Sequence, residues 1–554
     1  MTMQRISAIE QALRSGPARP GAFFWLAVAV LCLVAVGAYL NTLQGDFVYD
    51  DHTQVRDNPW IRDARHLVDI FTTSVWQFES ASSTSNYYRP LMHVWYLLAY
   101  QLFGPAPWGF HLINILLHAA VTVLVFLLTQ ELLRRTLPPG SLAALPAVAA
   151  ALLFAVHPIH TEVVAWIAAV PELSYSFFLL LSLYLYLQAR AGRRGAGAAS
   201  VISFALAALS KEPALTLPFI LFLSDHTIEP GQGPVPRLLR RYAPYLLVAA
   251  VYVALRWHAL GGLVQQEPHI KLSAWGYLIN VFPLFQQYLQ KLVLPVDLNL
   301  FSVFHPLDSL LEPRGLLSLA VAVLYAGGAV LACRRNRIVC FSMVMIVLPL
   351  LPALYIPALS VNVFSEHHLY LPSFGFALLF AYAFARLQAL RPKDTILLVA
   401  GTLALAAVSA AGTVSRNAVW RSELALYTDT LKKSPDAVEI RLNLGNVYAD
   451  RGQVQEAMEQ YRRTLELAPG YAEARNNLGI LYYDQRRFEE AVVEYRAALA
   501  LKPSYAEAHN NLGNAYAALG RTAEAAAAYA AALELKPDYA VARRNLELLH
   551  QRSK

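Results

Sequence analysis

The sequence predicts an all-α protein with two parts, a polytopic membrane domain followed by a superhelix of helical repeats. The 554 residues are 56% hydrophobic and only 15% charged, whereas soluble proteins are about 45–50% apolar and about 25% charged. Apolar runs dominate up to about residue 413; beyond it the chain is polar, rich in Ala, Glu and Arg, and repeats itself. We therefore expect a cytoplasmic segment 1–21, a membrane domain 22–413 with a first external loop 41–107, and a soluble domain 414–554.

Twelve apolar segments are candidates for membrane spans, because a helix needs about 20 apolar residues to cross a bilayer and shorter ones are tolerated inside a bundle. The first is longer than the apolar region of a signal peptide and is followed by many others, so we expect it to be retained. The segments are 22–40, 108–133, 144–157, 172–189, 198–210, 213–226, 242–258, 274–294, 313–333, 338–356, 370–389 and 394–413.

The basic residues lie in short clusters between these segments, which is typical of cytoplasmic loops and argues against a nucleic-acid surface despite the net charge of +7. Segment 274–294 contains Gln286, Gln287, Gln290 and Lys291, a composition that favours an interfacial helix. Without it, eleven crossings place every basic cluster inside. The first external loop, residues 157–172, 211–212 and 360–368, and the carboxyl terminus then share the external face.

Three cysteines occur in the chain, Cys32, Cys333 and Cys340, all in or beside apolar runs. From this placement we expect no disulfide framework.

The carboxyl-terminal region has a period of 34 residues. Gly445, Gly479 and Gly513 are spaced by this interval, as are matching Tyr, Ala and Pro positions. This pattern is that of the tetratricopeptide repeat, a helix–turn–helix unit that stacks into a superhelix. We predict repeats at 438–471, 472–505 and 506–539, a partial unit before them whose second helix spans 416–435, no flexible linker, and a capping helix at 540–554.

One repeat position is always asparagine: Asn443, Asn477 and Asn511, with Asn545 in the capping helix. Two interpretations are open. The amides could form a ladder that donates to and accepts from a bound peptide backbone, or they could satisfy local backbone groups.

The polar and Pro-interrupted motifs of the membrane domain all fall where predicted spans meet the external face. Asp50 and Asp51 follow the first span, and alone such a pair is usually solvated or caps a helix. However, charged residues beside apolar spans are costly and usually functional. The accompanying motifs are "YYRPL" (87–91), "HPIHTEVVAWIAAVPELSYSFF" (157–178), "LSKEPALTLP" (209–218), "QKLVLPVDLNLF" (290–301) and "SEHHLYLPSFGFAL" (365–378).

In this order, with the repeats behind them, these motifs resemble the transmembrane and tetratricopeptide-repeat O-mannosyltransferases (the TMTC family) and their bacterial relatives. The resemblance covers nearly the whole chain. It implies a GT-C glycosyltransferase fold, a polyprenyl-phosphate sugar donor and an acceptor on the lumenal or periplasmic side.

The resemblance also implies roles for the acidic pair and for nearby cations. By match to the family motif Asp50 is the expected base, which takes the proton of an attacking hydroxyl. Asp51 would orient the acceptor or the base, and the anomeric centre would be inverted. The departing phosphate needs cations; the candidates are Lys211, Arg89 and Arg256, although Arg89 could equally pair with Asp50 or Asp51 and Arg256 could be a snorkelling span end.

The remaining polar residues are expected to contact the sugar or the acceptor: His157, His160, Glu162, Glu172, Glu212, Glu366 and His367. Glu172 and Glu212 could instead pair internally. We expect no metal and no other cofactor, because the "HPIHTE" spacing does not place two histidines at i and i+4 of a helix. Relatives often have Arg where this chain has His367, and such a change would weaken a charge contact.

The sequence thus predicts an inner-membrane glycosyltransferase of a bacterium, with its active site and repeats on the periplasmic side, that moves a sugar, with mannose expected, to a protein Ser/Thr hydroxyl. Its partners would be the lipid-linked sugar, the acceptor protein bound by the repeats and membrane lipid, with no nucleic acid. Two alternatives stay open: a non-catalytic membrane-anchored scaffold for envelope assembly, and a GT-C enzyme with a lipid or glycan acceptor.

Overall fold

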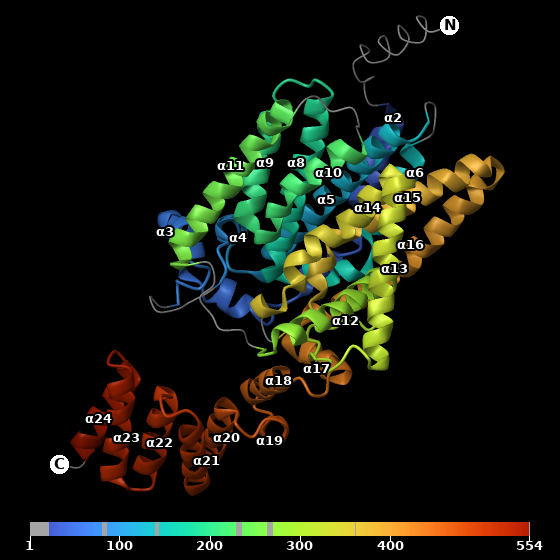
Figure 1. Ribbon diagram of the computed structural model, residues 1–554. Coiled ribbons are helices and arrows are strands. Elements are labelled where there is room, and N and C mark those ends of the chain that lie inside the picture. The colour runs from blue at the N-terminus through green and yellow to red at the C-terminus, as the bar shows by residue number, and fades with distance from the viewer. Residues whose placement is uncertain are drawn as a thin grey trace, which may run out of the picture. The chain divides into compact units, whose positions relative to one another are not determined.

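The computed structural model describes residues 21–79, 86–138, 143–228, 235–262, 270–359 and 362–552. These residues are largely helical and include no β-strand, which confirms the all-α prediction. They divide into two compact units (Figure 1): one reaches to Ser422, and the other starts at Glu423 and also includes residues 301–303. The predicted segment 1–21 lies outside the described residues except for Gly21.

Among the described residues of the first unit, eight helical segments are long and apolar enough to cross a bilayer, so the chain is a multi-pass membrane protein. One more is added if the helix pair 144–155 and 158–165, bent by 49°, is a single span. The helices of the eight segments are α2 (Ala22–Gly37), α5 (Pro107–Thr136), α8 (Val170–Arg190), α11 (Val235–Leu260), α13 (Pro313–Arg335), α14 (Arg337–Val347), α15 (Pro372–Leu390) and α16 (Thr395–Asn417).

Two further predicted spans are shorter helices, α9 (Ala196–Ser210) and α10 (Leu217–Thr227). The eleven-span topology needs both to cross and therefore stays a prediction. Helix α12 (Ala274–Val293), the segment that we discounted as a span, is not among the candidate spans.

The core of the first unit is packed around α5, whose residues are buried along most of its length. Small residues bring its neighbours together: Ser182 of α8 and Ser200 of α9 each donate a hydrogen bond of 2.7 Å to the other's backbone carbonyl. At Gly375 of α15 an added Cβ would lie 2.6 Å from the carbonyl oxygen of Ser342 in α14. These close approaches pack successive helices tightly against one another.

The remaining elements of the first unit are shorter, and many of them carry the polar motifs. Proline at the first helical position starts several of them, because its fixed φ and missing N–H suit a helix start. They are η1 (Leu40–Gln44), η2 (His52–Arg56), η3 (Pro59–Ile61), η4 (Ala64–His66), α3 (Leu67–Thr72), α4 (Pro90–Phe103), α6 (Ala144–Ala155), η5 (Pro158–His160), α7 (Thr161–Ala165), η6 (Ile167–Ala169), η7 (Glu212–Thr216), η8 (Leu348–Leu354), η9 (Ile356–Ala358), η10 (Glu366–Leu369), η11 (Pro392–Asp394) and η12 (Ala418–Arg421).

The expectation of no disulfide is wrong. Cys333 and Cys340 form a disulfide that joins the end of α13 to the start of α14. The sequence placed both cysteines beside apolar helices but did not show that the turn at Asn336 brings the two helix ends together. Cys32 is a free cysteine.

The second unit consists of paired helices that follow the predicted repeats (Figure 1). Gly445, Gly479 and Gly513 each face a tyrosine ring of the paired helix, and an added Cβ would lie only 2.5–2.7 Å from that ring. Only Ser422 separates η12 from α17, and the helix predicted at 416–435 begins at Glu423, because residues 416–421 belong to the end of α16 and to η12. The helices are α17 (Glu423–Lys433), α18 (Val438–Asp450), α19 (Val454–Leu467), α20 (Ala472–Asp484), α21 (Phe488–Leu501), α22 (Ala506–Ala518), α23 (Thr522–Leu535) and the capping helix α24 (Ala540–Arg552).

Candidate functional site

A cavity of about 380 Å³ lies within the first unit, and most of the predicted site residues line it. They come from segments far apart in sequence: the turn before η2, the turn before α4, the α7–η6 segment, the start of α8, the start of η7, the end of α11 and η10. The predicted residues in its wall are Asp50, Arg89, Glu162, Glu172, Lys211, Glu212, Arg256 and His367.

Asp50 lies in this wall directly after Tyr49, which has a left-handed backbone with φ of 56°. Such a conformation costs a non-glycine residue about 1–3 kcal/mol and is found mostly where the surrounding structure enforces it. The turn presents Asp50 to the cavity, where Gln54 Nε2 lies 3.5 Å from its Oδ2.

Asp51, by contrast, is fully buried and does not line the cavity. The backbone N–H of Ala168 donates to its Oδ1 at 2.7 Å, and that of Val48 donates to its Oδ2 at 3.1 Å. Burial raises the pKa of Asp51 well above its usual range, against these two hydrogen bonds. Of the two roles predicted for Asp51, contact with an acceptor does not fit this placement, whereas support of the Asp50 turn does.

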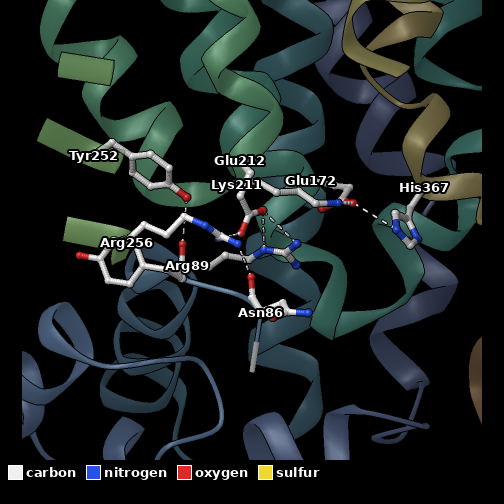
Figure 2. A network of polar contacts seen from close by, with 9 residues as sticks. Asn86, Arg89, Glu172, Lys211, Glu212, Tyr252, Arg256 and His367 are labelled. Atoms are coloured by element: carbon white, nitrogen blue, oxygen red, sulfur yellow. Dashed lines mark hydrogen bonds and ion pairs between the residues drawn. The ribbon is translucent and has the colours of Figure 1, made fainter. Parts of the chain in front are cut away.

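Three cations and two carboxylates form a network of polar contacts in the cavity wall (Figure 2). Nε and Nη2 of Arg89 donate to Glu212 Oε2 at 3.1 Å each. Arg256 donates to Glu212 Oε1 at 2.9 Å and to the carbonyl oxygen of Asn86 at 2.5 Å. Lys211 Nζ contacts Glu172 Oε1.

These contacts settle the internal pairing that the sequence left open. Glu172 and Glu212 pair with cations, and Arg89 pairs with Glu212 rather than with Asp50 or Asp51. In these ion pairs three cations face two carboxylates, and Asp50 and Glu162 add two further carboxylates to the cavity wall. The three cations can bind an anion only if it competes with their carboxylate partners.

The burial of this network changes the pKa values of its members. Burial lowers the pKa of the Lys211 ammonium, with Glu172 opposing the change. Burial alone would raise the pKa of Glu212, but Arg89 and Arg256 hold it below its usual range. On folding, Lys211 and Glu212 lose their contacts with water and gain charged partners instead. Removal of one of these partners would leave a buried, unpaired charge and lower the free energy of unfolding.

His367 connects this network to Glu162. Its Nδ1 lies 2.7 Å from Glu162 Oε1 and its Nε2 lies 3.4 Å from Glu172 Oε1. Glu162 is 3% exposed, and its second oxygen has no hydrogen-bond partner within the part of the chain that the structure describes. A buried carboxylate oxygen without a donor is costly, so a ligand that brings a hydroxyl or N–H to it would be stabilised there.

Three predicted contact residues do not line the cavity, so direct contact with a ligand there does not fit their placement. His160 is buried, with its Nε2 2.8 Å from the Ser373 hydroxyl. His157 caps η5, where its Nδ1 accepts from the backbone N–H of Ile159 at 3.3 Å. Glu366 accepts from the backbone N–H of Asn299 at 2.6 Å; burial, helped by the charge of Glu162, raises the pKa of Glu366 to about 8. The motifs identified the loops that form the cavity, but these three side chains point away from it.

Among the described residues, ligand atoms of Glu172, His367 and His368 lie within 4.8 Å of one another, a spacing that a metal ion could use. Lys211 already contacts one carboxylate oxygen of Glu172. The cluster as it stands is an ion-pair network, and the expectation of no metal stays a prediction.

Sequence reasoning missed an aromatic wall beside Asp50. Tyr49 and Trp166 both line the cavity with their ring centroids 6.0 Å apart, and Tyr175 and Tyr87 also face it. In the sequence, Trp166 is a single tryptophan in the apolar part of the motif "HPIHTEVVAWIAAV". A tryptophan in such a stretch usually belongs to the hydrophobic core, so the pattern did not indicate a cavity wall.

In the repeat unit, Asn477, Asn511 and Asn545 each donate to a different asparagine of the preceding repeat. Asn477 donates to Asn446 at 2.9 Å, and Asn511 donates to Asn476 at 3.0 Å. Asn545 donates to Asn510 at 3.0 Å. The amides are therefore pre-ordered in a line by neighbouring repeats rather than by local backbone groups, while the peptide-binding role stays a prediction.

Comparison with known proteins bears on both units. Models described as "TPR repeat" and "Tetratricopeptide repeat" match residues 445–486, 481–520 and 506–539. The predicted repeats are confirmed. Among solved structures, the "Crystal structure of MamA" aligns at 29% identity and a TM-score of 0.23 over 24% of this chain and 76% of that one.

The membrane unit and the repeats together match curated proteins. The chain is 29% identical to "Protein O-mannosyl-transferase F38B6.6" of Caenorhabditis elegans over 78% of this chain and 61% of that protein. It is 27% identical to the human "Protein O-mannosyl-transferase TMTC4" over 79% of this chain and 66% of that protein. The resemblance predicted from the motifs is confirmed. The chain matches less than two thirds of the length of these relatives.

Proposed function

We propose that this protein is a glycosyltransferase that moves a sugar, with mannose expected, from a polyprenyl-phosphate donor to a Ser/Thr hydroxyl of a protein, with inversion. The observation that carries the proposal is that Asp50 and the cations Lys211, Arg89 and Arg256 line one cavity. The relatives named as protein O-mannosyl-transferases support the sugar and the acceptor class.

In the proposed reaction the acceptor oxygen forms a bond to the anomeric carbon while the bond from that carbon to the phosphate oxygen breaks. The electron pair of the broken bond leaves with the phosphate, and the hydroxyl proton passes to Asp50. A carboxylate within about 3 Å of the hydroxyl can take that proton. A lipid phosphate leaves as an anion, so no acid is needed on that side.

The cation network supplies what the leaving group needs. Lys211, Arg89 and Arg256 would hold the phosphate, and charge developing on it in the transition state would be stabilised most strongly because the site is partly shielded from water. An anionic donor that enters the cavity would compete with Glu172 for Lys211 and loosen that pairing. We propose that the unpartnered oxygen of Glu162 accepts a hydrogen bond from a sugar hydroxyl.

The acceptor would reach the site through the repeats, whose pre-ordered asparagines offer amides at regular intervals along the superhelix. We propose the membrane of a bacterial cell as the location, with the site and the repeats on the periplasmic side. The positive-inside distribution of arginines supports this orientation.

The test is transfer from synthetic polyprenyl-phosphate mannose to a Ser/Thr-containing peptide by purified protein in lipid nanodiscs, followed by mass spectrometry of the peptide. Wild type should add a hexose and Asp50→Asn should add none, while binding the donor as wild type does. Asp57→Asn is the matched control, because Asp57 lies in the same loop, is exposed and pairs with Arg56. Equal transfer by wild type and Asp50→Asn would refute the base role, and a hexose found on a glycan but never on peptide would favour the other acceptor class.

A separate test addresses the repeats. Asn477→Ala combined with Asn511→Ala should weaken binding of the acceptor peptide without changing donor binding, whereas Gln453→Ala, an amide outside the line, should not. Unchanged peptide affinity in the double variant would remove the peptide-binding role.

A further inference from the structure

The last residues of the membrane unit are bound to the loop that carries Asp50. Asn417, at the end of α16, is 2% exposed and donates from its side-chain amide to the carbonyl oxygen of Ala38 at 2.9 Å. The same amide lies 2.8 Å from Asn41 Oδ1, and the Asn41 amide donates back to the carbonyl oxygen of Val414 at 3.0 Å. The start of the loop is therefore tied to a helix end more than 370 residues later.

A second tie lies four residues before the expected base. The backbone N–H of Asp46 donates to the carbonyl oxygen of Arg421 at 3.1 Å. Arg421 ends η12, the short turn that follows α16. The loop is thus held at both ends of η1, and the strained turn at Tyr49 begins just beyond the second tie.

The third contact supports the cavity wall. Trp420 is 2% exposed and stacks on Trp166, with ring centroids 6.0 Å apart and an interplanar angle of 26°. Trp166 in turn lies beside Tyr49 at 6.0 Å and His367 at 6.2 Å, and lines the cavity. Ala168, two residues after Trp166, donates its backbone N–H to Asp51 Oδ1 at 2.7 Å. The Asp50 turn is therefore fixed between two segments that both depend on residues 417–421.

We propose that residues 417–421, named here the brace, are a positioning element of the active site that fixes Asp50 and the Trp166 wall in the geometry needed for transfer. The proposal rests on the proposed function. None of the brace residues lines the cavity, so they act through Asp50 and Trp166 and not on the substrate. Such support matters because a displacement of about 1 Å at a catalytic group can reduce turnover about 100-fold.

The brace differs from ordinary core packing in a testable way. Its polar ties are directed at residues 38–46, where the chain leaves α2 and enters one loop, and Trp420 stacks on a wall residue of the site. Loss of the brace should therefore loosen residues 45–56 locally and leave the helical block intact. A purely structural role would lower the stability of the whole unit instead.

The test uses the full chain in lipid nanodiscs with Trp420→Ala, Asn417→Ala and the conservative Trp420→Phe. Val408→Ala, at an exposed position of α16, is the control. Amide hydrogen exchange is measured without substrate, and kcat and the donor KM are measured with polyprenyl-phosphate mannose. We expect faster exchange only in residues 45–56, a kcat about 10- to 100-fold lower with the donor KM changed less than about twofold, and recovery of both in Trp420→Phe.

Three results would overturn the proposal: unchanged exchange in residues 45–56 of Trp420→Ala and Asn417→Ala, faster exchange spread equally over α5 and α8, or wild-type kcat in both variants despite a loosened loop. If wild type transfers no sugar, the proposed function fails by itself, and the exchange pattern still decides whether the brace holds the Asp50 loop.

Discussion

Lys211→Met offers the sharpest test of the cation network, because the structure predicts separate effects on stability and on donor binding. The side chains of Lys211 and Glu172 are each 5% exposed and contact one another. Removal of one partner of a buried ion pair leaves an uncompensated charge, which typically costs about 3–5 kcal/mol of unfolding free energy. Removal of both partners is usually close to neutral. Lys211→Met should therefore be strongly destabilised, and Lys211→Met with Glu172→Gln should regain most of the lost stability.

Donor affinity should not recover in the double variant. A hydrogen bond to a charged group contributes about 1.5–3 kcal/mol, which corresponds to about 10- to 150-fold in Kd. Thermal unfolding in nanodiscs measures the first effect, and titration with polyprenyl-phosphate mannose measures the second. If the stabilised double variant binds the donor as tightly as wild type, Lys211 does not hold the phosphate and the assignment must pass to the two arginines. If the single variant is as stable as wild type, the pair is not buried as described.

Three further predictions concern other parts of the chain. Asp51→Asn should destabilise by about 1–3 kcal/mol, because an amide cannot accept from both backbone N–H groups; thermal unfolding would show it, and wild-type stability would contradict it. Gly479→Ala should cost about 1–3 kcal/mol in the repeat unit, since its Cβ would lie 2.7 Å from the Tyr495 ring, whereas Gly470→Ala, with nothing within 4 Å, should be neutral in the same melt. Burial raises the pKa of Glu366 to about 8, so protonated Glu366 contributes to the free energy of unfolding. This contribution is complete below the ordinary glutamate pKa, decreases by up to about 1.4 kcal/mol per pH unit above it, and is lost as pH rises through 8. Thermal unfolding from pH 5 to pH 9 should show this slope in wild type but not in Glu366→Gln.

Much of this protein followed from local sequence patterns. Apolar runs indicated the membrane helices, and a 34-residue period identified the repeats with their glycine–tyrosine packing, because these features depend on residues close together in the chain. The order of the Asp50, Arg89, Glu162, Lys211 and His367 motifs was also sufficient to predict that their loops share one site.

What the sequence could not supply was the direction of each side chain and its partner. Asp51 and Glu366 stand next to cavity residues, yet both are turned into backbone contacts. Only the tertiary structure pairs Arg89 with Glu212 across 123 residues and places Trp420 on Trp166. Such contacts depend on how distant helices pack, and the free energy of burying each charge or ring is determined there, so no local pattern of residues encodes them.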